Sequence, residues 1–183
     1  MISFIIIGRN EGWKLSRCLN SVYNTIKYNS ISRFEVIYVD SNSTDDSILR
    51  AKKFKNIKIL QITADYNSAI ARNIGAKISS GAILFFIDGD MEIIPDFLAL
   101  VYNIEKNKLI YPFISGQYIN YYYNQKGEII NKENYHKSIL KKDNYKVEVG
   151  GLFLIEKFIW ESVGGMRNKY KRSQDIDLSL RLA

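Results

Sequence analysis

The sequence predicts an α/β fold in which helices cover both faces of a mainly parallel, doubly wound β-sheet. Strand-sized apolar runs and helix-patterned segments alternate over about the first 105 of the 183 residues, and this order is typical of parallel strands joined by crossover helices. The central run, residues 83–87, contains no polar residue, which indicates a strand that is buried on both faces. The length suits one domain with a substantial core.

Two strand and helix pairs open the chain. Residues 3–7 form a predicted buried strand that leads into a glycine-bounded turn, and residues 13–28 place apolar side chains at helical spacing. Residues 34–39 form the next strand-sized run, which is mostly apolar. This run ends in a polar segment rich in helix N-cap residues, which predicts a helix through residues 48–54.

Two further pairs complete the alternation. Strand 57–62 precedes a helix over about 67–80, in which isoleucines share one side and small residues elsewhere permit close packing. We expect Gly81 to end this helix in a left-handed cap. Strand 83–87 follows, and Pro95 opens the last helix of the series.

The pattern changes in the second half of the chain. Residues 109–123 are aromatic and β-prone, whereas residues 124–146 are polar and predict a loop over the active face, or a solvated excursion without a role. Residues 147–155 include Gly150–Gly151, which indicates a place where the backbone passes close to another group. A short helix over 156–163 is expected to stop at the next two glycines.

The composition excludes several classes of protein. Cys18 is the only cysteine, so neither an intramolecular disulfide nor a cysteine metal cage can form. His136 is the only histidine and lies in a polar region without a pattern. The net charge of +7 suits a phosphorylated substrate, anionic lipid or nucleic acid. Nucleic acid is not expected, because no arginine-rich helix or aromatic ribonucleoprotein pattern occurs.

Two carboxylates stand directly after the central apolar run. Asp88 and Asp90 follow strand 83–87 and are separated only by Gly89. Open α/β sheets bind ligands at the carboxyl ends of their strands, and an Asp-Gly-Asp turn can direct both carboxylates at one hard cation. We therefore expect Mg²⁺ or Mn²⁺ here, bridging the protein to a phosphate-bearing substrate. The alternative is an ordinary turn with two solvated acids.

Another acid lies near the end of the sequence. Ser173 is the expected N-cap of a final helix, in which Asp175 and two leucines share one face while Asp177 and Arg181 pair across another. We expect Asp175 to point toward the body of the domain; the alternative is a first-turn acid that only interacts with the helix dipole. The sequence stops within this helix at Ala183, so we also expect a longer protein.

This ordered set of segments resembles the family 2 glycosyltransferases, which have the GT-A fold. The resemblance implies an inverting transfer of a sugar from a nucleotide diphosphate donor, with a UDP-sugar foremost, to a saccharide or lipid-linked acceptor. It implies Mn²⁺ or Mg²⁺ as cofactor and a cytoplasmic enzyme of envelope glycan synthesis, and the positive charge also allows work at the inner face of the membrane. The segments that carry it are 5–12, 39–47, 69–95, 150–151, 163–165 and 174–182.

The resemblance also implies residue roles within a single GT-A domain over residues 1–183. Residues 1–105 would form the nucleotide-sugar-binding half and residues 106–183 the acceptor-side half. Asp175 would be the general base, and Asp88 and Asp90 would bind the metal, with Asp88 also near the ribose. The remaining residues that it places at the nucleotide are Gly8, Arg9, Asn10, Glu11, Asp40, which would bind the nucleobase, and Arg72.

Some features depart from the family pattern, and two other functions stay open at this point. Gln174 stands where the family usually has Glu, which removes a charge beside the expected base. A nucleotidyltransferase would also use metal-binding acids on a nucleotide-binding sheet, but it would release pyrophosphate from a nucleoside triphosphate. A degenerate, non-catalytic glycosyltransferase-like binding domain is the other alternative.

Overall fold

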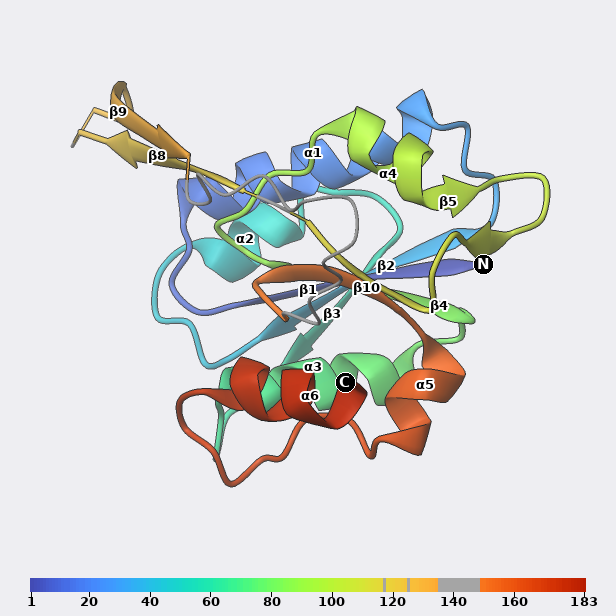
Figure 1. Ribbon diagram of the computed structural model, residues 1–183. Coiled ribbons are helices and arrows are strands. Elements are labelled where there is room, and N and C mark those ends of the chain that lie inside the picture. The colour runs from blue at the N-terminus through green and yellow to red at the C-terminus, as the bar shows by residue number, and fades with distance from the viewer. Residues whose placement is uncertain (117, 125, 135–148) are drawn as a thin grey trace.

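The computed structural model describes residues 1–116, 118–124, 126–134 and 149–183. A six-stranded sheet forms its centre (Figure 1), in the spatial order β3 (Ile57–Gln61), β2 (Phe34–Asp40), β1 (Ile2–Gly8), β4 (Ile83–Asp88), β10 (Leu152–Glu156) and β7 (Phe113–Ser115). The first four strands are mutually parallel, whereas β10 runs antiparallel to both of its neighbours. The predicted mainly parallel sheet is therefore confirmed.

Helices cover both faces of this sheet and complete an α/β/α sandwich (Figure 1). One face carries α1 (Trp13–Tyr28), α2 (Ser47–Ala51) and α4 (Pro95–Val101). The other carries α3 (Ser68–Ile78), α5 (Lys157–Ser162) and α6 (Gln174–Leu182). Among the described residues, none of these helices is long and apolar enough to cross a membrane.

Burial on both faces explains the unbroken apolar run of β1. Phe4 and Ile6 belong to the core that contains the buried residues of α1, while Ile5 and Ile7 belong to the core that contains those of α3. Successive side chains of a strand point to opposite faces, so each layer of helices requires apolar residues at every second position. Two such layers together leave little room for polar residues, and residues 4–7 of this strand are all apolar.

Helix α3 packs on the sheet through its small residues. A Cβ added at Gly75 would clash with Ile5, so a larger side chain would push the helix away from β1. Ile70 and Ile74 are only partly buried, and Ile78 is 39% exposed. The small residues are therefore the buried ones, while Ile70 and Ile74 pack at the edge of this core.

The predicted left-handed cap at Gly81 is wrong. Helix α3 ends at Ile78, an extended Ser79 follows, and Gly81 does not have a positive φ. Instead, the N–H of Gly81 donates to Ser3 Oγ at 2.9 Å, and an added Cβ would lie 2.9 Å from the carbonyl oxygen of Met1. Close packing against the first strand, rather than a special backbone conformation, requires glycine at this position.

The second half contains more β-structure than its polar sequence predicts. A short ribbon joins β5 (Tyr102–Asn103) to β6 (Lys108–Leu109), and a longer hairpin joins β8 (Ile119–Tyr123) to β9 (Ile129–Asn134). Strand β9 lies in the segment predicted as a loop, so that prediction is wrong over these residues. The hairpin projects from the body of the domain (Figure 1). His136 lies outside the described residues.

Candidate active site

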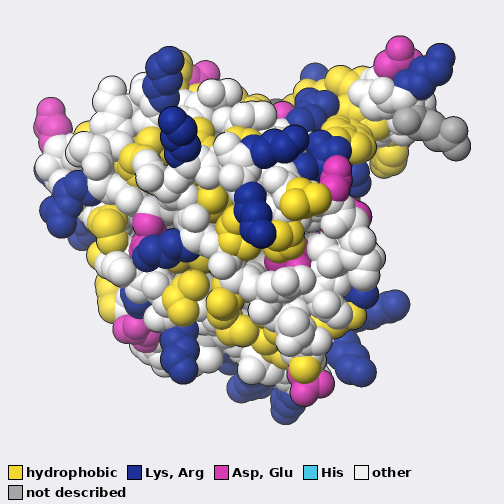
Figure 2. Space-filling model, turned by 180° about the vertical axis from the view of Figure 1, so that it is seen from behind, with side chains coloured by type: hydrophobic (Ala, Val, Ile, Leu, Met, Phe, Trp, Pro, Cys, Tyr) yellow, Lys and Arg dark blue, Asp and Glu magenta, His cyan; other side chains and the backbone are white. Residues whose placement is uncertain are grey.

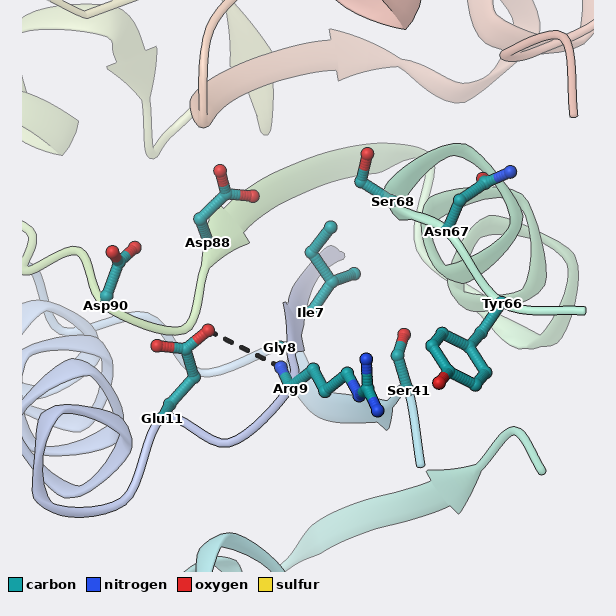
Figure 3. A pocket seen from close by; sticks show the side chains of 10 residues that line it. All are labelled: Ile7, Gly8, Arg9, Glu11, Ser41, Tyr66, Asn67, Ser68, Asp88 and Asp90. Carbon is teal, nitrogen blue, oxygen red and sulfur yellow. Dashed lines mark hydrogen bonds between the residues drawn. The ribbon is translucent and has the colours of Figure 1, made fainter. Parts of the chain in front are cut away.

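A pocket of about 350 Å³ lies where the carboxyl ends of β1, β2 and β4 meet the beginning of α3 (Figure 3). This is the edge at which open α/β sheets bind ligands. It is lined by the predicted site residues Gly8, Arg9, Glu11, Asp88 and Asp90, and also by Ile7, Ser41, Tyr66, Asn67 and Ser68. The structure thus brings the first-strand loop and the Asp-x-Asp turn to one place.

Sequence reasoning misses the wall that Tyr66, Asn67 and Ser68 form opposite the acids (Figure 3). The guanidinium of Arg9 lies over the Tyr66 ring, 4.6 Å from its centroid. Asn67 caps α3 by accepting a hydrogen bond from the N–H of Ile70 at 2.9 Å. Asparagine is a strong N-cap residue, and the helix start predicted at about residue 67 is confirmed. Tyr66 carries no comparable signal.

The acidic side of the pocket consists of Glu11, Asp88 and Asp90 (Figure 3). The N–H of Gly89 donates to the carbonyl oxygen of Ile7 at 2.7 Å, and an added Cβ would lie 3.1 Å from that oxygen. Glycine therefore lets the turn pack directly on β1. Burial raises the pKa of Glu11, and the nearby charges of Asp90 and Asp88 raise it further. Three acids that destabilise one another's charge favour a bound cation.

The donor atoms on this side suit a hard divalent cation. Mg²⁺ and Mn²⁺ prefer carboxylate, phosphate and water oxygens, and the acids supply only oxygen. Within the described part of the chain, no three His, Cys, Asp or Glu side chains are arranged to hold a metal ion by themselves. A cation at Asp88 and Asp90 would therefore complete its coordination with oxygens of a bound phosphate and of water.

Arg72 lies behind the pocket and not in its lining. The residue is 5% exposed, and its Nη2 donates to Asp88 Oδ1 at 2.6 Å. Burial raises the pKa of Asp88, and the positive charge of Arg72 opposes this rise. The position of Arg72 beside the nucleotide stays a prediction; in the structure it contacts and orients the Asp88 carboxylate, which borders the pocket.

The other side of Asp88 is closed by the Gly150–Gly151 segment. The N–H of Asp88 donates to the carbonyl oxygen of Gly151 at 2.8 Å, and a Cβ added at Gly151 would lie 3.1 Å from Asp88 Cγ. The close backbone approach predicted for this segment is therefore confirmed. Arg72 and Gly151 together hold the Asp88 carboxylate from two directions.

Asp40 is enclosed within the protein, and its expected contact with a nucleobase stays a prediction. The residue is fully buried, its Oδ1 accepts from the hydroxyl of Tyr38 at 2.9 Å, and its Oδ2 accepts from the N–H of Ser43 at 2.8 Å. The next residue, Ser41, lines the pocket in its place. The carboxylate of Asp40 thus holds the loop that positions Ser41.

Asn10 also binds this loop and does not line the pocket. Its backbone N–H donates to Ser43 Oγ at 2.8 Å, and its Oδ1 accepts from the N–H of Thr44 at 2.7 Å. The N–H groups of Glu11 and of the next residue both donate to Ser47 Oγ at 3.0 Å. These bonds between two loops fix the backbone that carries Glu11, so Asn10 supports the site from outside.

Helix α6 turns Gln174 toward the domain. Gln174 is 7% exposed; its Oε1 accepts from the hydroxyl of Ser68 at 2.9 Å, and its Nε2 donates to the carbonyl oxygen of Tyr170 at 2.7 Å. Ser173 occupies the predicted N-cap position, but it has a positive φ and its side chain makes no capping hydrogen bond. The start of α6 is instead anchored to the pocket wall through Gln174 and Ser68.

Asp175 is exposed, so the prediction that it shares the buried face of Leu178 is wrong. Its charge nevertheless contributes to the raised pKa of Asp88, which places it within electrostatic reach of the pocket. The predicted pair of Asp177 and Arg181 is confirmed, with Asp177 Oδ2 2.6 Å from Arg181 Nη2. The final helix therefore presents one acid to solvent near the pocket and keeps the next in an ion pair.

These features define a domain of the GT-A glycosyltransferase class: a mainly parallel sheet with one antiparallel strand beside β4, and an Asp-x-Asp turn at the pocket that the parallel strands form. The comparison with known families agrees. Residues 3–164 match the family described as "Glycosyl transferase family 2". The chain belongs to this family.

Relatives and solved structures support the same fold. The glycosyltransferase AglE of Haloferax volcanii is 40% identical over 93 residues, which cover 49% of this chain and 30% of AglE. The structure of S. aureus TarS residues 1–349 aligns with a TM-score of 0.71 at 18% identity, covering 99% of this chain and 54% of that chain. The structure of the mannosyltransferase PcManGT from Pyrobaculum calidifontis, in complex with GDP-Man and Mn²⁺, aligns with a TM-score of 0.66 at 18% identity. The alignment covers 97% of this chain and 50% of that chain. The chain spans less than two thirds of each of these proteins.

Proposed function

We propose that this domain catalyses the inverting transfer of a sugar from a nucleoside diphosphate donor to an acceptor hydroxyl during synthesis of a cell-envelope glycan. The observation that carries the proposal is the position of Asp88 and Asp90 at the rim of the pocket, with Arg72 and Gly151 holding Asp88 in place. A turn with merely solvated acids needs neither support. The nucleotidyltransferase and non-catalytic alternatives are not favoured by membership of this family.

The wall opposite the acids suits the nucleotide. The ring of Tyr66 offers an aromatic surface to a base, and the guanidinium of Arg9 beside it supplies positive charge for phosphate oxygens. Ser41 and Ser68 add hydroxyl groups to the same pocket. A TarS structure in complex with UDP aligns with this chain at a TM-score of 0.64 and 15% identity. We therefore place a UDP-sugar first among donors and a GDP-sugar second.

Asp88 and Asp90 would hold the divalent cation, Mn²⁺ or Mg²⁺, together with the donor phosphates. When bound, this ion would stabilise the negative charge that builds up on the departing diphosphate. Arg72 keeps the Asp88 carboxylate oriented toward the pocket from behind. Glu11 adds a third negative charge on the same side, which raises the local affinity for a cation.

Asp175 is the candidate general base. It lies in the first turn of α6, and Gln174 next to it is bonded to the pocket-lining Ser68. From there its carboxylate would take the proton of the acceptor hydroxyl while that oxygen attacks the anomeric carbon. The bond to the diphosphate breaks on the opposite side of the sugar. One such displacement inverts the anomeric configuration.

The acceptor is proposed to be a saccharide or a lipid-linked glycan. The net charge of +7 favours a surface rich in phosphate, such as the inner face of the cytoplasmic membrane, where the domain would associate peripherally. Residues 1–105 would bind the donor, and residues 106–183 would contribute most of the acceptor side. Each of these assignments depends on the donor site, which is therefore tested first.

The test measures thermal stabilisation by UDP, GDP and their sugars, with and without Mn²⁺. We expect stabilisation that requires both nucleotide and metal, since anything that binds the folded state raises its stability. Asp90→Ala should abolish this effect, whereas Asp175→Asn should keep it and lose sugar transfer. Failure of every nucleotide to stabilise the protein with Mn²⁺, or equal loss of binding in both variants, would contradict the assigned roles.

A further inference from the structure

A strip of aromatic and basic side chains runs from the pocket rim onto the β8–β9 hairpin. Trp13 begins α1, two residues after the pocket-lining Glu11. Its ring packs edge-on against Tyr123 of the hairpin, with centroids 5.0 Å apart. The guanidinium of Arg17 lies over both rings, 5.9 Å from the centroid of Trp13 and 5.1 Å from that of Tyr123. The inner end of the strip thus joins the hairpin to α1.

The outer end of the strip repeats this pairing of ring and cation. Tyr121 lies two residues before Tyr123 and therefore on the same face of β8. Lys132 is directly opposite Tyr121 on β9, and its Nζ lies 5.6 Å from the centre of the ring. Figure 2 shows apolar and basic side chains together along the projecting hairpin. Below, "the aromatic strip" means Trp13, Arg17, Tyr121, Tyr123 and Lys132.

Packing explains only the inner part of this arrangement. An isolated two-stranded hairpin is marginally stable in water, so the contact between Trp13 and Tyr123 has a structural use. Trp13 nevertheless remains 37% exposed, and Tyr121 remains 43% exposed on the hairpin. Arg17 is ion-paired with Glu92 at 2.7 Å, but both side chains are at least 40% exposed. Such a surface pair is weak, so Arg17 can exchange Glu92 for an anionic ligand.

We propose that the aromatic strip binds an anionic glycan chain. Sugar rings would pack on Trp13 and Tyr121, and phosphate or carboxylate groups of the chain would pair with Arg17 and Lys132. The net charge of +7 favours a charged chain over a neutral one.

The position of the strip identifies this chain as the acceptor. Trp13 lies two residues after Glu11, and Glu92, the partner of Arg17, lies two residues after Asp90. A chain on the strip would therefore present its end at the acidic side of the pocket. This part of the inference rests on the proposed transferase function. Rings and cations also suit single-stranded nucleic acid, but the continuity with the pocket favours a glycan.

The first experiment locates the bound chain by fluorescence. The protein has two tryptophans, and Trp160 is only 4% exposed. Titration with polygalacturonate, which carries carboxylates, or phosphomannan, which carries phosphates, should change the emission of Trp13 saturably at low salt. Trp13→Phe should abolish the change, and neutral dextran should bind at least about tenfold more weakly because it lacks charge. An unchanged emission with both anionic glycans would overturn the proposal.

The second experiment measures dissociation constants from the anisotropy of fluorescein-labelled polygalacturonate. Lys132→Glu should weaken binding about fivefold, from the reversal of one exposed charge contact. Lys106→Glu is the matched control, because it makes the same change at an exposed lysine between β5 and β6. Equal weakening by both variants, or tighter binding of oligo(dT) than of either glycan, would refute a glycan site on the strip.

Nucleotide binding separates this proposal from the proposed function. Trp13→Phe and Lys132→Glu should leave the stabilisation by UDP and Mn²⁺ unchanged, because neither residue lines the donor pocket. If the unaltered protein binds the glycan but not UDP with Mn²⁺, the transferase function is rejected and the aromatic strip stays a glycan site. The reverse result would reject the strip alone.

Discussion

Gln174→Glu places a carboxylate where the structure needs an amide. The Nε2 of Gln174 donates to the carbonyl oxygen of Tyr170 at 2.7 Å, and the residue is 7% exposed. An ionised carboxylate cannot donate this bond, although it can still accept from Ser68. Glutamate is the residue that the family resemblance predicts here, so this variant tests whether the local structure of this chain outweighs the family pattern.

The size of the effect follows from these contacts. Losing the bond to Tyr170 costs about 1 kcal/mol, and leaving a charged oxygen against a carbonyl costs about 1–3 kcal/mol more. The positive end of α6 offsets only about 0.3–1 kcal/mol of this. We therefore expect a net loss of about 2–3 kcal/mol, which lowers the Tm of a chain of this size by roughly 4–12 °C.

The assay is thermal unfolding of Gln174→Glu and Gln174→Met at pH 7.5 and pH 4. Burial should raise the pKa of the introduced carboxyl above its usual value of about 4.3. The destabilisation caused by the carboxylate charge is then absent below the usual pKa, where the group is protonated in both states, and it grows as the pH rises through the raised pKa. The Tm values of the two variants should therefore differ most at pH 7.5. Gln174→Met loses both bonds without adding charge and should be less destabilised.

Transfer activity reports the consequence for Asp175. Loosening the start of α6 should lower kcat about tenfold, equivalent to about 1.4 kcal/mol of barrier, while UDP affinity changes little. A Gln174→Glu protein with unchanged Tm at pH 7.5 and unchanged kcat would refute the anchoring role. Loss of UDP affinity without loss of kcat would show that Gln174 acts through Ser68 on the donor instead.

Three further predictions follow from the site. Gly151→Ala should abolish Mn²⁺-dependent UDP binding, because the added Cβ would meet the Asp88 carboxylate. Gly150→Ala should keep this binding, since a Cβ at Gly150 would lie 3.9 Å from its nearest neighbour. Isothermal titration of both variants with UDP and Mn²⁺ checks the prediction. Burial raises the pKa of Glu11 and of Asp88, so as the pH is lowered these carboxylates should become protonated before an ordinary carboxylate does. Protonation removes ligand charge, so the affinity for Mn²⁺ should already fall between pH 7 and pH 5. An affinity that does not change over this range would contradict the prediction. The thiol of Cys18 is fully buried and its pKa is raised, so it should react with a disulfide reagent at pH 8 only after denaturant is added; rapid reaction in the folded state would show an open core.

The elements of the first half were predictable because their signals are local. Residues 4–7 of β1 are all apolar since two helical layers cover the strand, and the Asp-Gly-Asp turn follows β4, one of the three strands that end at the pocket. Periodicity also predicts the pair of Asp177 and Arg181, because residues four apart are neighbours on any helix. None of these features needs information from a distant segment.

The orientation of Asp175 and Asp40 was not predictable for the opposite reason. Spacing shows that Asp175 and Leu178 lie on adjoining parts of one helix face. Which of these parts is buried depends on the hydrogen-bond partners of Gln174. One of these partners, Ser68, lies 106 residues earlier in the chain, so a local pattern does not reveal it. Asp40 ends its strand at the pocket edge, as predicted. Its side chain is drawn inward by the hydroxyl of Tyr38, a contact that depends on burial and not on sequence pattern.

Asp88 shows why the proposed donor and acceptor halves would not form independent sites. Arg72 reaches its carboxylate from the first half, while Gly151, on the antiparallel strand side of the second half, accepts its backbone N–H and packs against its side chain. A change in the acceptor half that shifts β10 would therefore move Asp88 and weaken donor binding without touching the nucleotide. The antiparallel pairing of β10 with β4 is what couples the two halves, because it brings a glycine late in the chain to the end of the central strand.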